Sequence, residues 1–216
     1  MPLTTPIARE KLHTRAIEIC GYHRADGLYD IEAHLVDTKS YGFANKDRGF
    51  IAAGEALHGM WLRLTVDESM EIVACEAVTD DGPYTACPAA APNFAALTGL
   101  RIKAGFLREA QHRVGGIHGC THLRELLQQM ATTAFQTINP YRVWREAQAR
   151  GEASIPGTDT LDERISHKIL GGNAAIVNSC LAYASDGEVV RRRWPALYTG
   201  PHAAEPATAA PAEAGS

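Results

Sequence analysis

The residues best suited to chemistry lie close together near the middle of the chain. Residues 118–125 read His-Gly-Cys-Thr-His-Leu-Arg-Glu, which brings His118, Cys120, His122 and Glu125 into one short segment. Thiolate and neutral imidazole are good ligands for zinc and iron. His122 and Glu125, three positions apart, would share one face of a helix. The spacing matches no established metal-binding motif, so a complete metal site would need donors from elsewhere in the chain.

Three interpretations of this cluster stay open. As a metal site, it would take its further donors from His34, Asp37 or His58, which fall in predicted strands. As a nucleophile, Cys120 would lie at the start of a helix beside a histidine, where the reactive thiolate is favoured. As a structural feature, Cys120 would be a small buried residue and His122 would cover the first helical turn.

A second group of candidates lies in a strand predicted at 56–66. In an extended strand, His58 faces one way while Trp61 and Arg63 face the other. A histidine here could act as an acid or a base, because its reference pKa is about 6.5. Trp61 would offer an aromatic platform, and Arg63 would hold a carboxylate or a phenolate. The structural alternative is a core tryptophan beside a surface arginine.

Four further candidates come from the strands, a loop and a helix. His34 and Asp37 fall on opposite faces of a predicted strand, so the geometry of the strand does not by itself pair them. Tyr41, in the loop that follows, is a candidate phenol acid. Gln129 belongs to an uncharged polar strip on a long predicted helix, and such a strip predicts burial against the sheet or the lining of a polar pocket. We therefore count His34, Asp37 and Gln129, with Trp61, as candidate ligand-binding residues.

The elements that must position these residues begin with strands. Alternating apolar and polar residues predict four antiparallel strands, at about 13–24, 28–39, 56–66 and 70–79. Asp26-Gly27 is a strong hairpin signal between the first two. Residues 45–49 are polar and predict a loop. The short connections favour a meander sheet with one face left for helices to cover.

From about residue 83 the spacing becomes helical. Helices are predicted at 89–97, 105–114 and 121–138. The longest carries an apolar stripe at steps of three and four, made of Leu123, Leu126, Leu127, Met130, Ala134 and Ile138. Asn139-Pro140 should end this helix, because proline has no N–H for the next helical hydrogen bond. A further helix is predicted at 141–150.

Signals after Gly151 are weaker. They predict a loop at 155–158, a helical turn at 164–170, and two strands at 179–183 and 188–193 that pair across Ser185-Asp186-Gly187. The run Arg191-Arg192-Arg193 is interpreted as a solvated strand end or loop.

Together these elements predict an α+β fold. It consists of a four-stranded antiparallel meander sheet, covered on one face by a helical C-terminal half with one long central helix. We expect a single domain over residues 1–200, strand-rich at 12–80, helix-rich at 83–150 and mixed at 151–200. The Ala/Pro-rich tail at 201–216 is predicted to be disordered.

Composition excludes several classes of protein. The 216 residues carry a net charge of -4, which gives no sign of a nucleic-acid partner. No signal-peptide pattern and no apolar run of about 18 residues occurs, so we expect a cytoplasmic protein without a membrane partner. Five widely spaced cysteines without a Cys-x-x-Cys pair indicate reduced thiols. The lack of a glycine-rich nucleotide loop argues against kinases and dehydrogenases.

The chain resembles a bacterial family catalogued as domain of unknown function 2889. The resemblance extends to about Tyr198 and rests on six motifs: Leu12-His13-Thr14-Arg15, Gly27-Leu28-Tyr29-Asp30-Ile31-Glu32, His34-Leu35-Val36-Asp37-Thr38-Lys39, His58-Gly59-Met60-Trp61-Leu62-Arg63-Leu64, Gly119-Cys120-Thr121-His122-Leu123 and Met130-Ala131-Thr132-Thr133-Ala134-Phe135-Gln136. It implies that the family concentrates its polar motif residues at Asp30, Glu32, His34, Asp37, His58, Arg63, Cys120 and His122. It also implies a link with the catabolism of aromatic compounds.

We therefore expect a small-molecule enzyme of aromatic (phenylpropanoid or lignin-derived) compound catabolism. It would be a lyase that uses acid–base chemistry without a nucleotide cofactor. His58 or His122 would be the base, Arg63 would hold an anionic group of the substrate, and Tyr41 or Cys120 would be the acid.

Two other classes stay open. One is a non-catalytic metal- or ligand-binding accessory protein of a catabolic operon, with zinc or iron as the metal. The other is a structural interaction module with an exposed apolar face. The sequence leaves open the substrate, a homo-oligomeric state, and the sheet face that the long helix covers. That face decides whether His34 and His58 look toward Cys120.

Overall fold

The computed structural model describes residues 3–151 and 177–201. The chain divides into two compact units, residues 1–142 and residues 143–216. The first unit holds the sheet, the helices that cover it and the candidate site. The single domain expected over 1–200 stays a prediction.

Four long strands form one antiparallel sheet in the order β1-β2-β5-β6. They are β1 (His13–His23), β2 (Tyr29–Lys39), β5 (Ala56–Val66) and β6 (Ile72–Asp81). Together with the helices that follow, they confirm the α+β fold and the antiparallel sheet predicted from the alternating patterns.

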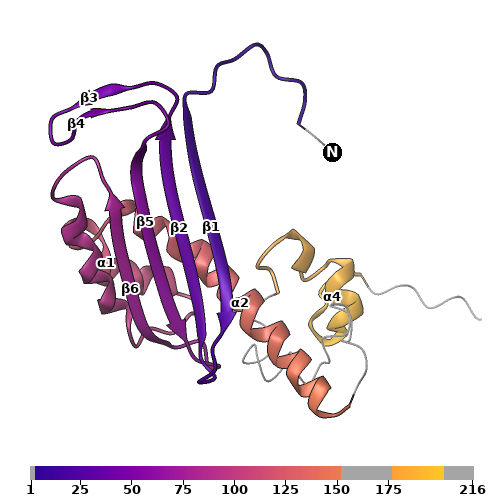
Figure 1. The fold of residues 1–216 in the computed structure, drawn as a ribbon. Helices are drawn as coiled ribbons and strands as arrows, with labels where there is room; N and C mark the ends of the chain where they lie inside the picture. Colours follow the sequence, from indigo (N-terminus) through magenta and orange to yellow (C-terminus); the bar gives the residue numbers. More distant parts are fainter. Residues whose placement is uncertain (1–2, 152–176, 202–216) are drawn as a thin grey trace, which may run out of the picture. The chain divides into compact units, whose positions relative to one another are not determined.

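A short hairpin is inserted between β2 and β5, where the sequence predicts a loop. It consists of β3 (Phe43–Asn45) and β4 (Gly49–Ile51), and Figure 1 shows it at one end of the sheet. The Asn45 side chain accepts the backbone N–H groups of Asp47 and Arg48, both at 2.9 Å, which stabilises the turn. The Arg48 guanidinium donates to the Ala56 carbonyl at 2.8 Å and so ties the hairpin to the start of β5.

The hairpin of β1 and β2 turns where Asp26-Gly27 predicts it. The backbone N–H of Arg24 donates to the Leu28 carbonyl at 2.8 Å. Gly27 has a φ of 86°, a left-handed conformation that glycine adopts without strain. Paired residues lie equally far from Asp26 along the chain, and this register brings Arg15 opposite Asp37.

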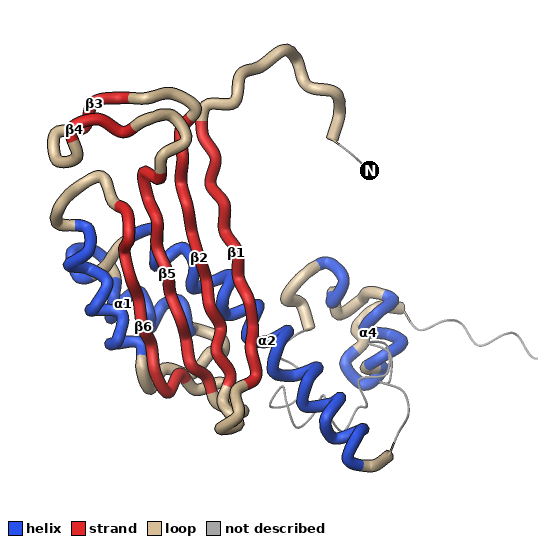
Figure 2. Tube along the Cα trace, viewed as in Figure 1, coloured by secondary structure: helices blue, strands red, loops and turns tan. Residues whose placement is uncertain are grey.

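The described helices of the first unit cover one face of this sheet, as Figures 1 and 2 show. They are the 3₁₀-helix η1 (Cys87–Leu97), α1 (Phe106–Val114) and the first part of α2 (Thr121–Ala149). Tyr29, Ile31, Ala33 and Leu35 of β2 are fully buried beneath them, while the residues between are only partly buried. His58 of β5 lies on the same covered face as these residues, and His34 lies on the other.

The predicted apolar stripe of α2 packs onto the sheet. All six of its members are fully buried in one core with the strand residues: Leu123, Leu126, Leu127, Met130, Ala134 and Ile138. A Cβ at Gly21 of β1 would collide with the Thr137 side chain of α2, so glycine permits the close approach of strand and helix there. Neither α2 nor any other helix of the described ranges is long and apolar enough to cross a membrane.

The prediction that the long helix ends before Pro140 is wrong. α2 continues to Ala149 with Pro140 inside it, so the separate helix expected at 141–150 is the last part of α2. A proline inside a helix costs about 3 kcal/mol, because one hydrogen bond is lost and the ring crowds the preceding turn. Ile138 before it lies in the core and Tyr141 after it packs against the core, and this packing offsets the cost.

The described part of the second unit contains short helices. After the end of α2, they are η5 (Leu181–Tyr183), α4 (Glu188–Arg193) and η6 (Pro195–Leu197). The two strands predicted at 179–183 and 188–193 are therefore wrong, and the arginine run forms the last turn of α4. Glu188 pairs with Arg191 at 2.7 Å, and both charges suit the helix dipole. The loop at 155–158, the turn at 164–170 and residues 202–216 of the tail lie outside the described residues.

Candidate functional site

Asp37 lies at the centre of a cluster of titratable side chains on the helix-covered face of the sheet. Its side chain is only 1% exposed. The Arg15 guanidinium donates to both carboxylate oxygens at 2.8 Å, from Nε to Oδ1 and from Nη2 to Oδ2. His58 Nδ1 lies 3.0 Å from Oδ2, and His13 Nε2 lies 3.3 Å from Oδ1. Both oxygens of this buried carboxylate are therefore satisfied.

Strand register brings these groups into one row. Arg15 of β1, Asp37 of β2 and His58 of β5 lie directly opposite one another across three strands. The register shifts at two points beside His58, which leaves Leu57 without a partner on β2 and Asp80 without a partner on β5. Such bulges bend a strand and re-aim its side chains, and they are common beside functional sites.

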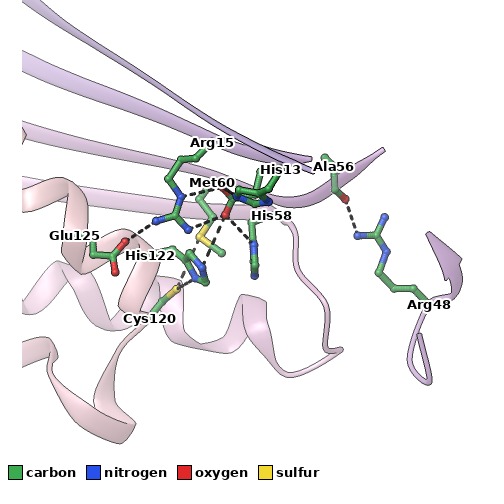
Figure 3. Close-up of polar contacts among 10 residues, drawn as sticks. His13, Arg15, Arg48, Ala56, His58, Met60, Cys120, His122 and Glu125 are labelled. Atoms are coloured by element: carbon green, nitrogen blue, oxygen red, sulfur yellow. Dashed lines mark hydrogen bonds and ion pairs between the residues drawn. The ribbon is translucent and has the colours of Figure 1, made fainter. Parts of the chain in front are cut away.

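The start of α2 completes the cluster, as Figure 3 shows. The His122 ring lies over the His58 ring, with centroids 3.9 Å apart and planes tilted by 33°. Its Nε2 lies 3.9 Å from Asp37 Oδ2. Glu125, one turn further along α2, accepts a hydrogen bond of 2.7 Å from Arg15 Nη1. His122 and Glu125 thus face the same cluster, as their spacing predicts.

Cys120 immediately precedes α2, and its carbonyl accepts the N–H of Arg124 at 3.0 Å. Its half-buried thiol lies 3.8 Å from His122 Nδ1 and 3.8 Å from Met60 Sδ. A Cβ at Gly119 would collide with the Val114 carbonyl, so glycine lets the chain pass there and present Cys120 to the sheet.

All five cysteines are unpaired, in line with the expected reduced thiols. Cys75 of β6 is largely enclosed, and burial raises the pKa of its thiol to about 12. It therefore stays protonated at neutral pH. Cys120 is the one cysteine that contacts a histidine of the described cluster.

The charges of the cluster are set by burial and by the neighbouring groups. Burial alone would raise the pKa of the Asp37 carboxyl, but the Arg15 guanidinium outweighs it and holds this pKa below its usual value. Burial lowers the pKa of His58, and the nearby His122 lowers it further, against an opposing effect of Asp37. At neutral pH, Asp37 is therefore a carboxylate and His58 a neutral imidazole. Its Nδ1–H donates to Asp37, which leaves the Nε2 lone pair free.

The same residues offer donors for a metal ion. Asp37, His58 and His122 each present one ligand atom, and these atoms lie within 4.8 Å of one another. Imidazole and carboxylate are common ligands of zinc and iron. Of the three strand donors considered from the sequence, Asp37 and His58 face the helix start and His34 does not. A metal ion would have to compete with Arg15 for Asp37, because both carboxylate oxygens already accept from the guanidinium.

Three of the predicted site residues lie on the opposite face of the sheet. His34 and Trp61 stack with ring centroids 3.8 Å apart and planes 7° apart. Arg63 donates to Glu32 at 2.6 Å and to Glu76 at 3.0 Å. Trp61 and Arg63 border a shallow hollow of about 270 Å³ whose lining is Glu32, Trp61, Leu62, Arg63, Glu76 and Val78. The sheet itself separates Arg63 from His58, so the expectation that Arg63 holds a substrate for that base needs correction.

Tyr41, Gln129 and His118 also lie apart from the cluster. Tyr41 is 47% exposed, and in the described chain it contacts Phe43 and Lys39. Gln129 is exposed, as are Thr132 and Gln136, so the uncharged strip of α2 is not buried against the sheet as expected. The His118 side chain is exposed, while its backbone N–H donates to the Gly115 carbonyl at 3.2 Å and its carbonyl accepts from the Asn93 side chain at 3.0 Å.

Sequence reasoning missed Arg15 and His13 as site residues. A signal for both was present, because the alternation of β1 and the Asp26-Gly27 turn together place Arg15 opposite Asp37. Met60 was not singled out either, because its contact with Cys120 depends on where α2 begins.

The fold and the cluster define a class: an antiparallel sheet covered by helices, with a buried carboxylate–arginine–histidine cluster at the start of the long helix. Residues 13–136, more than half of the chain, match the model of the family described as "Protein of unknown function (DUF2889)". The chain belongs to this family, and the matched segment includes every member of the Asp37 cluster. No curated protein and no solved structure matches the chain.

Proposed function

We propose that the protein is an acid–base enzyme for a small molecule, a lyase that works without a nucleotide cofactor. The Asp37–His58 pair carries this proposal. A buried carboxylate holds Nδ1 of a histidine at 3.0 Å, and Nε2 of that histidine has no partner among the described residues. An oriented, neutral imidazole of this kind is a good general base at neutral pH.

His58 is the base in this proposal, and Asp37 orients its ring and stabilises the imidazolium that forms when Nε2 takes a proton. Cys120 supplies the proton that the leaving group needs, since its thiol lies beside His122 Nδ1 at 3.8 Å. Tyr41, the other candidate acid, has no contact with the cluster in the described chain. Positioned acid–base catalysis of this type contributes on the order of 10²–10⁴ to a rate.

Access from solvent supports a small substrate. The His58 side chain is 13% exposed and the His122 side chain 23%, so both are enclosed and still reachable. Aromatic compounds of phenylpropanoid or lignin origin remain the predicted substrates, and a cytoplasmic location remains the predicted site of action. Both expectations come from the sequence.

A substrate screen tests the proposal. The full-length protein is incubated with a panel of phenolic and phenylpropanoid-derived compounds, and products are followed by mass spectrometry. We expect turnover that falls at least about 100-fold in His58→Asn and also falls in His122→Asn. His112→Asn, at an exposed histidine of α1, is the matched control and should keep the wild-type rate. Folded His58→Asn and His122→Asn variants with full turnover would show that the assignment is wrong.

A second candidate function is a metal-binding accessory protein, which the mutual proximity of Asp37, His58 and His122 favours. Elemental analysis of the purified untagged protein separates the two. Stoichiometric zinc or iron that disappears in Asp37→Asn, with no turnover in the screen, would favour the accessory protein. Turnover by metal-free protein would favour the enzyme.

A further inference from the structure

Three soft donor atoms meet where α2 begins. Cys120 Sγ lies 3.8 Å from Met60 Sδ and 3.8 Å from His122 Nδ1. The three residues come from β5, from the residue before α2 and from its first turn. Figure 3 shows their side chains turned toward one another. The proposed function uses Cys120 and His122 but gives Met60 no role.

We propose that Met60, Cys120 and His122 form a binding site for a soft monovalent metal ion, Cu(I). Thiolate and thioether sulfur are soft ligands that select Cu(I), and imidazole also suits copper. Thioether sulfur is a poor ligand for hard ions such as Mg²⁺ and Ca²⁺, which take oxygen donors. A methionine sulfur beside a cysteine sulfur therefore points to a copper-like ion.

The spacing of the donors suits one ion. Two ligand atoms 3.8 Å apart that each lie about 2.2 Å from an ion subtend an angle of about 120° at it. Cys120 Sγ has this separation from Met60 Sδ and from His122 Nδ1. Thiolate and imidazole ligands keep about 2.0–2.3 Å from an ion of the size of zinc. An ion shared by Cys120 and either neighbour would thus need little movement of those two side chains.

The surroundings hold these donors in place. The Met60 side chain is 1% exposed and lies in the core, so its sulfur has few alternative positions. His122 turns Nδ1 toward Cys120 and Nε2 toward the Asp37 carboxylate, 3.9 Å away. A carboxylate behind the second ring nitrogen is the usual way in which a protein orients a metal-binding histidine.

Charge also favours a monovalent ion. Cu(I) with one thiolate is neutral overall, which suits a half-buried position better than the net positive charge of a divalent ion with the same ligands. This site uses Nδ1 of His122, whereas the proposed base is Nε2 of His58. Both proposals use the Cys120 sulfur, and a copper ion bound there would remove the proposed acid. Copper transfer and turnover are therefore measured separately, so that one proposal can fail without the other.

Competition with a coloured chelator tests the site. The reduced full-length protein is titrated under anaerobic conditions with the Cu(I)–bicinchoninate complex, and loss of colour reports copper transfer. We expect one Cu(I) per chain in the wild type. Met60→Leu keeps an apolar side chain of similar volume and should bind on the order of 10-fold more weakly or worse. Cys120→Ser should lose the site.

Two cysteines away from the cluster supply the controls. Cys20→Ser, on β1, and Cys180→Ser, at an exposed position, should bind copper as the wild type does. No transfer to the wild type would overturn the proposal, as would equal binding by Met60→Leu or loss of binding in either control. X-ray absorption of the loaded protein gives a second readout, with two sulfurs and one nitrogen expected around copper. A shell of nitrogen and oxygen alone would contradict the site.

Discussion

Arg15 and Asp37 lie directly opposite each other on β1 and β2, and their side chains share two hydrogen bonds of 2.8 Å. The pair joins β1, at the edge of the sheet, to the buried carboxylate of Asp37. Arg15 also reaches Glu125 of α2 at 2.7 Å, so one guanidinium connects two strands and the long helix. Because His58 bonds to the same carboxylate, the geometry of the proposed base depends on Arg15.

Removal of Arg15 should therefore destabilise the protein. Arg15→Met leaves Asp37 buried with less compensation, and we expect a loss of about 1–3 kcal/mol in the free energy of unfolding, since Arg15 is itself partly exposed. Arg63→Met is the matched control. Arg63 also pairs with two carboxylates, but it is 46% exposed on the open face of the sheet, and its loss should cost no more than about 1 kcal/mol. Urea titration measures the free energy of unfolding of both variants, and equal losses would contradict the prediction that Arg15 matters more than Arg63.

His58 should make the stability of the protein depend on pH. Its pKa is lowered in the folded state, so between that pKa and about 6.5 the unfolded chain binds more protons. The contribution of a neutral His58 is therefore complete above about pH 6.5 and declines as the pH falls through the folded-state pKa. In His58→Asn the free energy of unfolding should vary less over this range. His112→Asn should keep the wild-type slope, and an unchanged slope in His58→Asn would refute the prediction.

Period-two alternation predicted the four long strands because it is a local signal that each strand carries for itself. The same alternation correctly separated His34 from Asp37, and His58 from Trp61. It could not decide which face α2 covers, since both faces carry apolar and ionisable residues. Because α2 covers the face that carries His58, the His58 ring lies against His122, and Arg63 lies on the other face of the sheet.

Two errors arose where tertiary packing or charge outweighed a local signal. Pro140 is a strong helix breaker by itself, yet core residues on both sides carry α2 through it. The segment 188–193 pairs two valines with three arginines and resembles a strand, yet the Glu188–Arg191 pair and the burial of Val190 favour a short helix. The packing around Pro140 and the burial of Val190 are visible only with the partners in space, whereas the i, i+3 spacing of Glu188 and Arg191 is a local helix signal.

Replacement of Pro140 tests whether core packing offsets the cost of a proline inside α2. Pro140→Ala restores a backbone N–H within α2 and should raise the free energy of unfolding by about 1–3 kcal/mol. Thermal and urea unfolding measure the gain. Tyr141→Ala, in the next position, should lower stability because it removes a ring that packs against the core. A neutral or destabilising Pro140→Ala would mean that the helix needs the proline.

The protonation state of the His58 ring is the sharpest test of its role as the base, because the measurement needs no knowledge of the substrate. We would titrate ¹⁵N-labelled protein by NMR and assign His58 from the resonances that disappear in His58→Asn. We expect a neutral ring at pH 7, protonated at Nδ1, with a pKa below about 6.5 that rises in His122→Asn. A pKa of His58 at or above that value, or a neutral ring protonated at Nε2, would contradict its role as the base.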